Sequence, residues 1–195
     1  MSDKYTIRDQ TKAHFITLTV VGWIDVFTRL NQKNMIIDAL RFCQENKGLI
    51  IYAYCLMPSH LHMICQAQEN AVLSDILRDL KKFTSKKIIK LLHDEPESRK
   101  EWMTKLFEDA CRHLKRNVQY KVWQDGNQSK ELFSNKFIWQ KLNYIHMNPV
   151  TDKIVARPYD YLFSSARNYA GLDSLLDVTL LSPELKTTSK TSESF

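Results

Sequence analysis

Two histidines separated by one residue are the side chains of this sequence that could most readily bind a metal ion. His60-Leu61-His62 lies in an apolar, strand-like run, followed by Met63. Side chains on a strand alternate between its two faces, so His60 and His62 share one face, with Cβ atoms roughly 6.5–7 Å apart. Two imidazoles at that spacing can converge on one cation.

A third ligand has to come from another segment. The helix expected over Ser134 to Asn148 presents Tyr144 and Asn148 one turn apart, and Lys141 shares their side. The same pattern also fits a purely structural interpretation, in which Tyr144 packs at a helix edge and Asn148 caps the helix before Pro149. The residue before a proline disfavours the α region, so the helix is predicted to end there.

The segments that position these residues alternate between strand-like and helix-like patterns. Alternating or β-branched runs predict strands over His14–Val21, Leu49–Leu56, His60–Ala67 and Arg116–Gln124. Apolar residues at helical spacing predict helices over Asn31–Lys47, Val72–Leu92, Lys100–Leu114 and Ser134–Asn148. The resulting order is close to the βαββαβ arrangement. We therefore expect an α+β, ferredoxin-like antiparallel sheet covered by helices on one face, with residues 95–115 as an extra helical insertion.

Length and composition are those of a globular chain. The 195 residues include 28 Lys and Arg against 22 Asp and Glu, 44% are hydrophobic, and only four are Gly and five Pro. These values exclude a wholly disordered or collagenous chain. We expect one domain over residues 1–186 and a disordered polar tail over residues 187–195.

No run of the sequence is long enough to span a bilayer. The longest apolar run, Gly48 to Met57, has ten residues, whereas a membrane helix needs about 20. The polar N-terminal residues predict no secretory signal, so we expect a cytoplasmic protein. The four cysteines stand singly in apolar segments and are expected to be core thiols without disulfides.

The helix expected over Val72–Leu92 carries a local excess of positive charge. Its cations are Arg78, Lys81, Lys82, Lys86, Lys87 and Lys90. Such an excess fits either a solvated helix face or a contact with a nucleic-acid backbone. Single-stranded DNA also binds aromatic platforms, and the candidates, each of which equally fits a core position, are Trp23, Phe27, Tyr54 and Trp123.

Three segments in order give the sequence a family resemblance. They are Cys55-Leu-Met-Pro-Ser-His-Leu-His-Met-Ile, Lys141-Leu-Asn-Tyr-Ile-His-Met-Asn-Pro-Val150 and Pro158-Tyr-Asp-Tyr-Leu-Phe-Ser-Ser165. Together they resemble the single-tyrosine HUH transposases (the IS200-like family), and most of all the REP-associated tyrosine transposase branch. The resemblance covers roughly residues 12–171.

The resemblance implies a function for each of the residues above. His60 and His62 match the HUH histidines that bind magnesium or manganese, Asn148 matches a third, amide ligand, and Tyr144 matches the nucleophile. The implied activity is a metal-dependent cut in single-stranded, hairpin-bearing DNA through a 5′-phosphotyrosine link, followed by rejoining. Lys141 and the cations of the basic helix would contact the DNA. Relatives act as monomers or as homodimers that exchange the tyrosine helix.

Two other interpretations remain open. Cys55 would lie opposite His62 across the hairpin, so Cys55, His60 and His62 could form part of a zinc site, although Cys65 falls on the other face. A non-catalytic DNA- or RNA-binding protein could also keep the fold and the basic helix without cutting.

Overall fold

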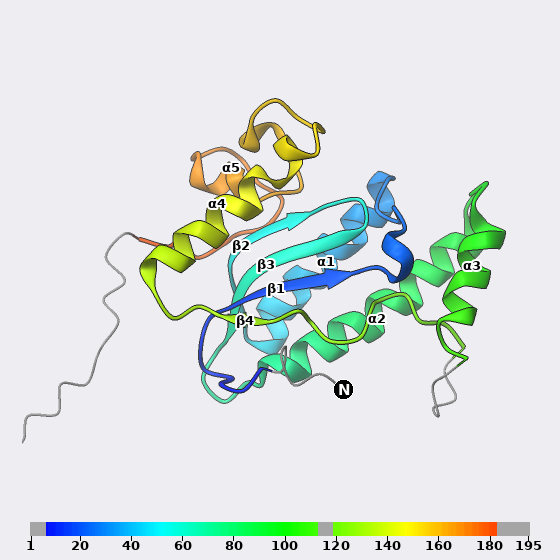
Figure 1. Cartoon of the computed structure of the whole chain (residues 1–195), viewed down its shortest axis with the longest axis horizontal. Helices are drawn as coiled ribbons and strands as arrows, with labels where there is room; N and C mark the ends of the chain where they lie inside the picture. Colours follow the sequence, from blue (N-terminus) through cyan, green and yellow to red (C-terminus); the bar gives the residue numbers. More distant parts are fainter. Residues whose placement is uncertain (1–6, 113–118, 183–195) are drawn as a thin grey trace, which may run out of the picture.

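The centre of the protein is a four-stranded antiparallel sheet, whose strands are labelled in Figure 1. A computed structural model describes residues 7–112 and 119–182. The strands are β1 (His14–Thr19), β2 (Leu49–Leu56), β3 (His60–Ala67) and β4 (Lys130–Glu131). Their spatial order is β2-β3-β1-β4, which is the order of the βαββαβ arrangement. The predicted α+β class with an antiparallel sheet is confirmed.

The hairpin of β2 and β3 follows the predicted boundaries. Its turn closes with a hydrogen bond from the Met57 amide to the His60 carbonyl at 2.8 Å. The pairs Leu56 with Leu61 and Cys55 with His62 fix the register, so the histidines begin directly after the turn. Thr17 on β1 pairs with His62 on β3, which places a threonine on the same face of the sheet as the histidines.

Helices lie on both sides of this sheet, and not on one face only as the sequence predicted. They are α1 (Leu30–Lys47), α2 (Leu73–Asp94), α3 (Lys100–Asp109), α4 (Asn135–Thr151) and α5 (Ala166–Tyr169), with short 3-10 turns η2 (Val21–Trp23) and η3 (Pro158–Asp160). In Figure 1, α1 and α2 pass behind the sheet, whereas α4 lies across its other side. None of the helices in residues 7–112 and 119–182 is apolar enough over a sufficient length to cross a membrane.

The two faces of the sheet differ in chemistry. Ile16 and Leu18 on β1 pair with Met63 and Leu61 on β3, and all four are at most 2% exposed. By alternation, Thr17 and the two histidines point to the opposite face, toward α4. One face therefore forms the core beneath α1 and α2, while the other is left for polar residues.

The fourth strand lies later in the chain than predicted. The expected strand over Arg116–Gln124 falls partly outside the described residues, and its remainder makes only a single bridge, between Trp123 and Val20. Trp123 stacks on Phe27 at 5.7 Å and donates from Nε1 to the Thr84 hydroxyl at 2.9 Å. The segment therefore pairs only with the end of β1, and the strand that pairs with the start of β1 is β4.

The end of α4 also differs from the prediction. The helix continues through Pro149 to Thr151, and the amides of Asp152 and Ile154 donate to the carbonyls of Asn148 and Pro149 at 3.0 and 2.9 Å. A proline within a helix removes one backbone hydrogen bond, and that loss falls here in the last turn of a helix whose Pro149 ring is buried. Asn148 is therefore not the cap of this helix. The helix expected over Lys100–Leu114, earlier in the chain, is also shorter in the structure and ends at Asp109.

Candidate active site

The two predicted histidines present a matched pair of ring nitrogens. Their ring centroids are 4.5 Å apart with planes at 71°. His62 Nδ1 lies 2.9 Å from the Thr17 hydroxyl, and His60 Nδ1 lies 3.1 Å from the Ser59 hydroxyl. When each Nδ1–H donates to its hydroxyl, each Nε2 keeps a lone pair, which is the tautomer that can bind a metal.

Burial keeps both imidazoles neutral. It lowers the pKa of His62 to about 3, and the charges of His60 and Lys141 act in the same direction. Burial also lowers the pKa of His60, although the charge of Asp152 opposes that shift. Neutral imidazole is the form that ligates metal ions.

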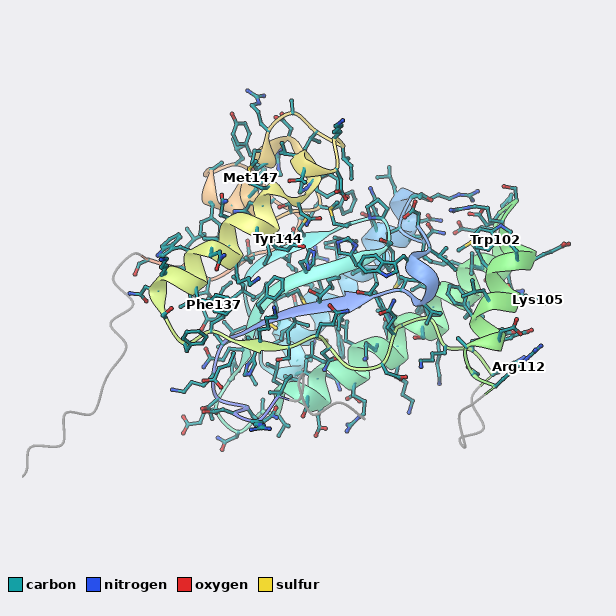
Figure 2. All side chains as sticks on the ribbon, viewed as in Figure 1. Trp102, Lys105, Arg112, Phe137, Tyr144 and Met147 are labelled. Carbon is teal, nitrogen blue, oxygen red and sulfur yellow. The ribbon has the colours of Figure 1, made fainter. Side chains whose placement is uncertain are left out.

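Helix α4 brings four polar residues to the histidine face. Lys141, Tyr144, Asn148 and Asp152 follow one another at helical spacing of three, four and four residues. Figure 2 shows Tyr144 between α4 and the sheet. Its ring meets that of His62 edge to face at 5.2 Å, and its side chain is 45% exposed.

One cavity of about 490 Å³ is lined by both histidines and by the four polar residues of α4 named above. It therefore brings together Tyr144, both histidines, Asn148 and Lys141, as the sequence predicts. Lys141 Nζ lies 5.4 Å from the centre of the Tyr144 ring. The other lining residues are Phe15, Thr17, Trp23, Gln128, Lys130 and Asp152. Asp152 was missed because the helix was expected to end at Pro149; the spacing from Asn148 would have found it.

Two orphaned acceptors indicate that the residues fit a cation. His62 Nε2 and Asn148 Oδ1 are buried without a hydrogen-bond partner, and an unpaired buried polar atom is costly. Within the described part of the chain, no three His, Cys, Asp or Glu side chains are placed to share an ion. A metal at this site would thus take the two imidazoles and the amide oxygen, a donor set suited to magnesium or manganese.

The geometry argues against the zinc interpretation. Cys55 does lie opposite His62, but its thiol is fully buried and donates toward the Met57 sulfur at 3.6 Å. Burial raises the pKa of Cys55 to about 12. Cys55 does not line the cavity that holds both histidines, and within the described residues no three His, Cys, Asp or Glu side chains are placed to share an ion.

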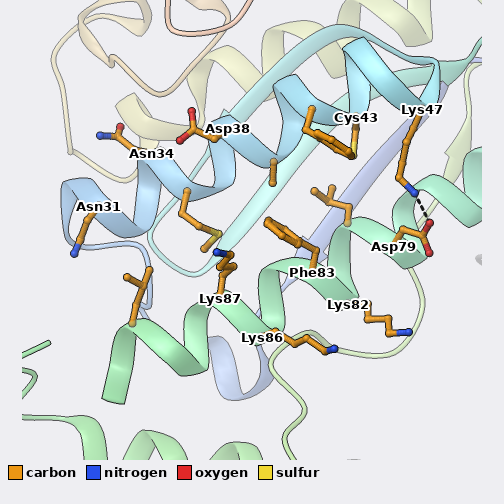
Figure 3. A pocket seen from close by; sticks show the side chains of 15 residues that line it. Asn31, Asn34, Asp38, Cys43, Lys47, Asp79, Lys82, Phe83, Lys86 and Lys87 are labelled. Carbon is orange, nitrogen blue, oxygen red and sulfur yellow. Dashed lines mark hydrogen bonds and ion pairs between the residues drawn. The ribbon is translucent and has the colours of Figure 1, made fainter. Parts of the chain in front are cut away.

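The basic residues of α2 lie away from this cavity. Lys82, Lys86 and Lys87 line a second groove, of about 800 Å³, between α1 and α2 (Figure 3). Lys81 instead donates to the Gly126 carbonyl at 3.0 Å, and burial lowers its pKa. Arg78 pairs with Asp75 and Lys90 with Asp94. Of the seven predicted DNA-contacting cations, only Lys141 reaches the histidines.

The four aromatic residues considered as stacking platforms differ in exposure. Phe27, Tyr54 and Trp123 are at most 5% exposed and belong to the core. Trp23 is 58% exposed and lies at the cavity, with its ring 5.4 Å from that of His60. Only this one of the four can meet a nucleic acid.

The family of this chain follows from comparison with known protein families. The family described as "Transposase IS200 like" matches residues 9–113, and the chain belongs to it. The matched residues include both histidines and end before Tyr144.

The fold is also that of a solved structure. It is described as the structure of a REP-associated tyrosine transposase bound to a REP hairpin, and it superposes with a TM-score of 0.60 at 22% identity. The superposition covers 94% of this chain and 96% of that chain. No curated protein matches this chain.

Proposed function

We propose that this transposase-family chain cuts and rejoins single-stranded DNA through Tyr144, with a divalent metal held by His60, His62 and Asn148. One observation carries the proposal: an exposed tyrosine, two neutral imidazoles and two unpaired buried acceptors share one cavity. A purely structural role for these groups would leave the acceptors unsatisfied at a cost to folding. A bound cation would satisfy both acceptors.

The proposed step is transesterification. The Tyr144 oxygen forms a bond to phosphorus as the bond from phosphorus to the 3′ oxygen breaks, which leaves a 5′-phosphotyrosine link. The phenol loses one proton and the 3′ oxygen gains one, so the step consumes no water and no outside energy. The reverse attack by a 3′-hydroxyl rejoins a strand.

The chain's own residues position the reacting groups. Ser59 and Thr17 hold the imidazoles, and Phe15 packs edge to face with the Tyr144 ring at 5.9 Å. Lys141 Nζ, close to both aromatic rings, would bind a phosphate oxygen. A bound magnesium or manganese ion would supply Lewis-acid polarisation of the scissile phosphate.

We propose that each site is built from one chain. Tyr144 lies beside His62 of its own chain, so no exchange of α4 with a second copy is needed to assemble it. This supports cleavage in cis by a monomer, whereas a homodimer with exchanged helices would need α4 to leave this position.

We further propose that Lys82, Lys86 and Lys87 contact the DNA backbone outside the catalytic cavity, as a hairpin stem would require. No ion pair engages these three within the described ranges. Arg78 and Lys90 would add to this surface, whereas Lys81 is held by the Gly126 carbonyl. Replacing the three lysines with alanine should reduce the slope of the logarithm of the DNA-binding constant against the logarithm of the salt concentration by about 2–3. At saturating DNA the variant should still form the covalent adduct.

The test of the reaction is covalent capture. The full chain is incubated with labelled single-stranded hairpin oligonucleotides and magnesium, manganese or chelator, and a denaturing gel is examined for a protein–DNA adduct. We expect a metal-dependent adduct that disappears in Tyr144→Phe. Tight, salt-sensitive binding with no adduct on any oligonucleotide would instead support the non-catalytic binding function.

A further inference from the structure

Trp23 is an aromatic side chain displayed at the mouth of the catalytic cavity. It is 58% exposed, whereas Val20 and Ile24, at the two ends of its turn, are at most 6% exposed. Its indole meets the His60 ring edge to face at 5.4 Å and 70°. A large apolar ring held in water gains little from folding.

The backbone at this position is strained. Gly22 and Trp23 have φ values of +68° and +56°, and positive φ is unfavourable for a bulky residue. The turn is fixed by hydrogen bonds from the Val21 amide to the Val122 carbonyl at 2.8 Å and from the Trp23 amide to the Val20 carbonyl at 3.0 Å. Folding alone would favour glycine at residue 23, so strain and exposure both indicate a role in binding.

The surroundings of Trp23 match the parts of a nucleotide. The cavity that it borders, about 490 Å³ in volume, lies in the range of small-molecule sites, roughly 300–1,000 Å³. Lys130 and Lys141 line the same cavity as the histidines and Tyr144, where a phosphate would bind. An aromatic face at the edge of a phosphate site suits a base, because every base offers a π face.

We propose that Trp23 is the stacking platform for the nucleobase next to the phosphate that Tyr144 attacks. This proposal rests on the proposed function, because it needs a single strand in the catalytic cavity. Stacking on the indole would hold the strand in register with Tyr144 and would favour unpaired bases over a duplex, whose faces are already stacked.

The test separates base stacking from backbone attraction. Two fluorescein-labelled probes, a dT 12-mer and a 12-mer of abasic sites, are titrated with the full chain at fixed salt. Trp23→Ala should weaken binding of the dT 12-mer by about 5- to 150-fold, with less than a twofold change on the abasic probe. Trp102→Ala is the matched control, because Trp102 is 49% exposed on α3, well away from Tyr144 in Figure 2; it should change neither.

A second variant guards against misfolding. Trp23→Gly removes the ring and relieves the positive φ, while glycine adds freedom to the unfolded chain, so its unfolding temperature should stay within about 5 °C of the wild type. It should lose dT binding as Trp23→Ala does.

The outcomes distinguish the platform from the reaction. Equal losses on both probes, or a loss below twofold on dT, overturn the platform and leave the Tyr144 adduct as evidence for the proposed function. A base-dependent loss with no Tyr144 adduct supports the platform and overturns the reaction. A wild-type chain that does not bind the dT 12-mer overturns the platform, while adduct formation on the hairpin oligonucleotides still decides the proposed function.

Discussion

Replacing Thr17 with valine should weaken divalent-ion binding while leaving the fold intact. The substitution keeps the shape of the side chain and removes only the hydroxyl that lies 2.9 Å from His62 Nδ1. The His62 ring would then lose the contact that fixes its tautomer and orientation, whereas His60 would keep its own contact with Ser59.

The expected loss of metal affinity follows from the position of the Thr17 hydroxyl. It contacts Nδ1 of His62 and not Nε2, the nitrogen proposed to bind the metal. Loss of such an outer contact weakens metal binding by about 10- to 100-fold, which corresponds to about 1.4–2.7 kcal/mol. Leaving His62 Nδ1 buried without a partner costs about 1–3 kcal/mol of stability. That is less than the roughly 5–15 kcal/mol of a typical domain, so the variant should remain folded.

The assay is calorimetric titration of the purified chain with manganese at pH 7, alongside adduct formation at rising manganese. Thr19→Val is the matched control, because the neighbouring Thr19 hydroxyl on the same strand face is buried with no hydrogen-bond partner. Thr17→Val should need about 10- to 100-fold more manganese, while Thr19→Val should not. Equal affinities in Thr17→Val and the wild type would refute the view that the hydroxyl orients the ligand.

Three further predictions concern assembly and stability. Mixing Tyr144→Phe with His62→Ala should restore no adduct if each site is built from one chain; recovery on a denaturing gel would mean that α4 is exchanged between copies. Gly48→Ala should lower the free energy of unfolding by about 1–2 kcal/mol in urea, because φ is +71° and an added Cβ would lie 3.2 Å from Gln68 Cβ; no loss would contradict the strain. Hydrogen bonds from Arg99 hold the pKa of Glu97 at about 2, so their contribution is complete above pH 5 and is lost as the pH falls toward 2. Glu97→Gln should therefore be less stable by about 2 kcal/mol at pH 7, with the difference disappearing at acid pH; a constant difference in chemical denaturation would contradict this.

The residues of the candidate site could be predicted because their spacing and their elements are local properties of the sequence. His60 and His62 alternate on a strand whose limits the structure reproduces, and Tyr144 and Asn148 are one turn apart on a helix that the sequence also predicts. That the two segments meet in one cavity required the family resemblance, since periodicity does not specify which helix crosses which strand.

The remaining features depend on tertiary contacts that the sequence does not display. Alternation over residues 118–122 favours a strand, but the Trp123 side chain enters the core beside Thr84, and β4 forms at Lys130–Glu131 instead. Pro149 stops most helices, yet here it is accommodated near the end of one. The exposure of Trp23 follows from a turn with two positive φ values, which no propensity predicts.

The buried cysteines provide this protein with an internal chemical reporter. Cys55 on β2 is paired with His62 on the neighbouring strand β3. It is fully buried, and burial raises its pKa to about 12. Burial therefore disfavours the reactive thiolate at neutral pH, and it keeps reagents away from the sulfur while the hairpin is closed. The rate at which Cys55 is alkylated therefore measures how often β2 separates from the histidine-bearing strand β3. A ligand bound at the histidines should lower that rate.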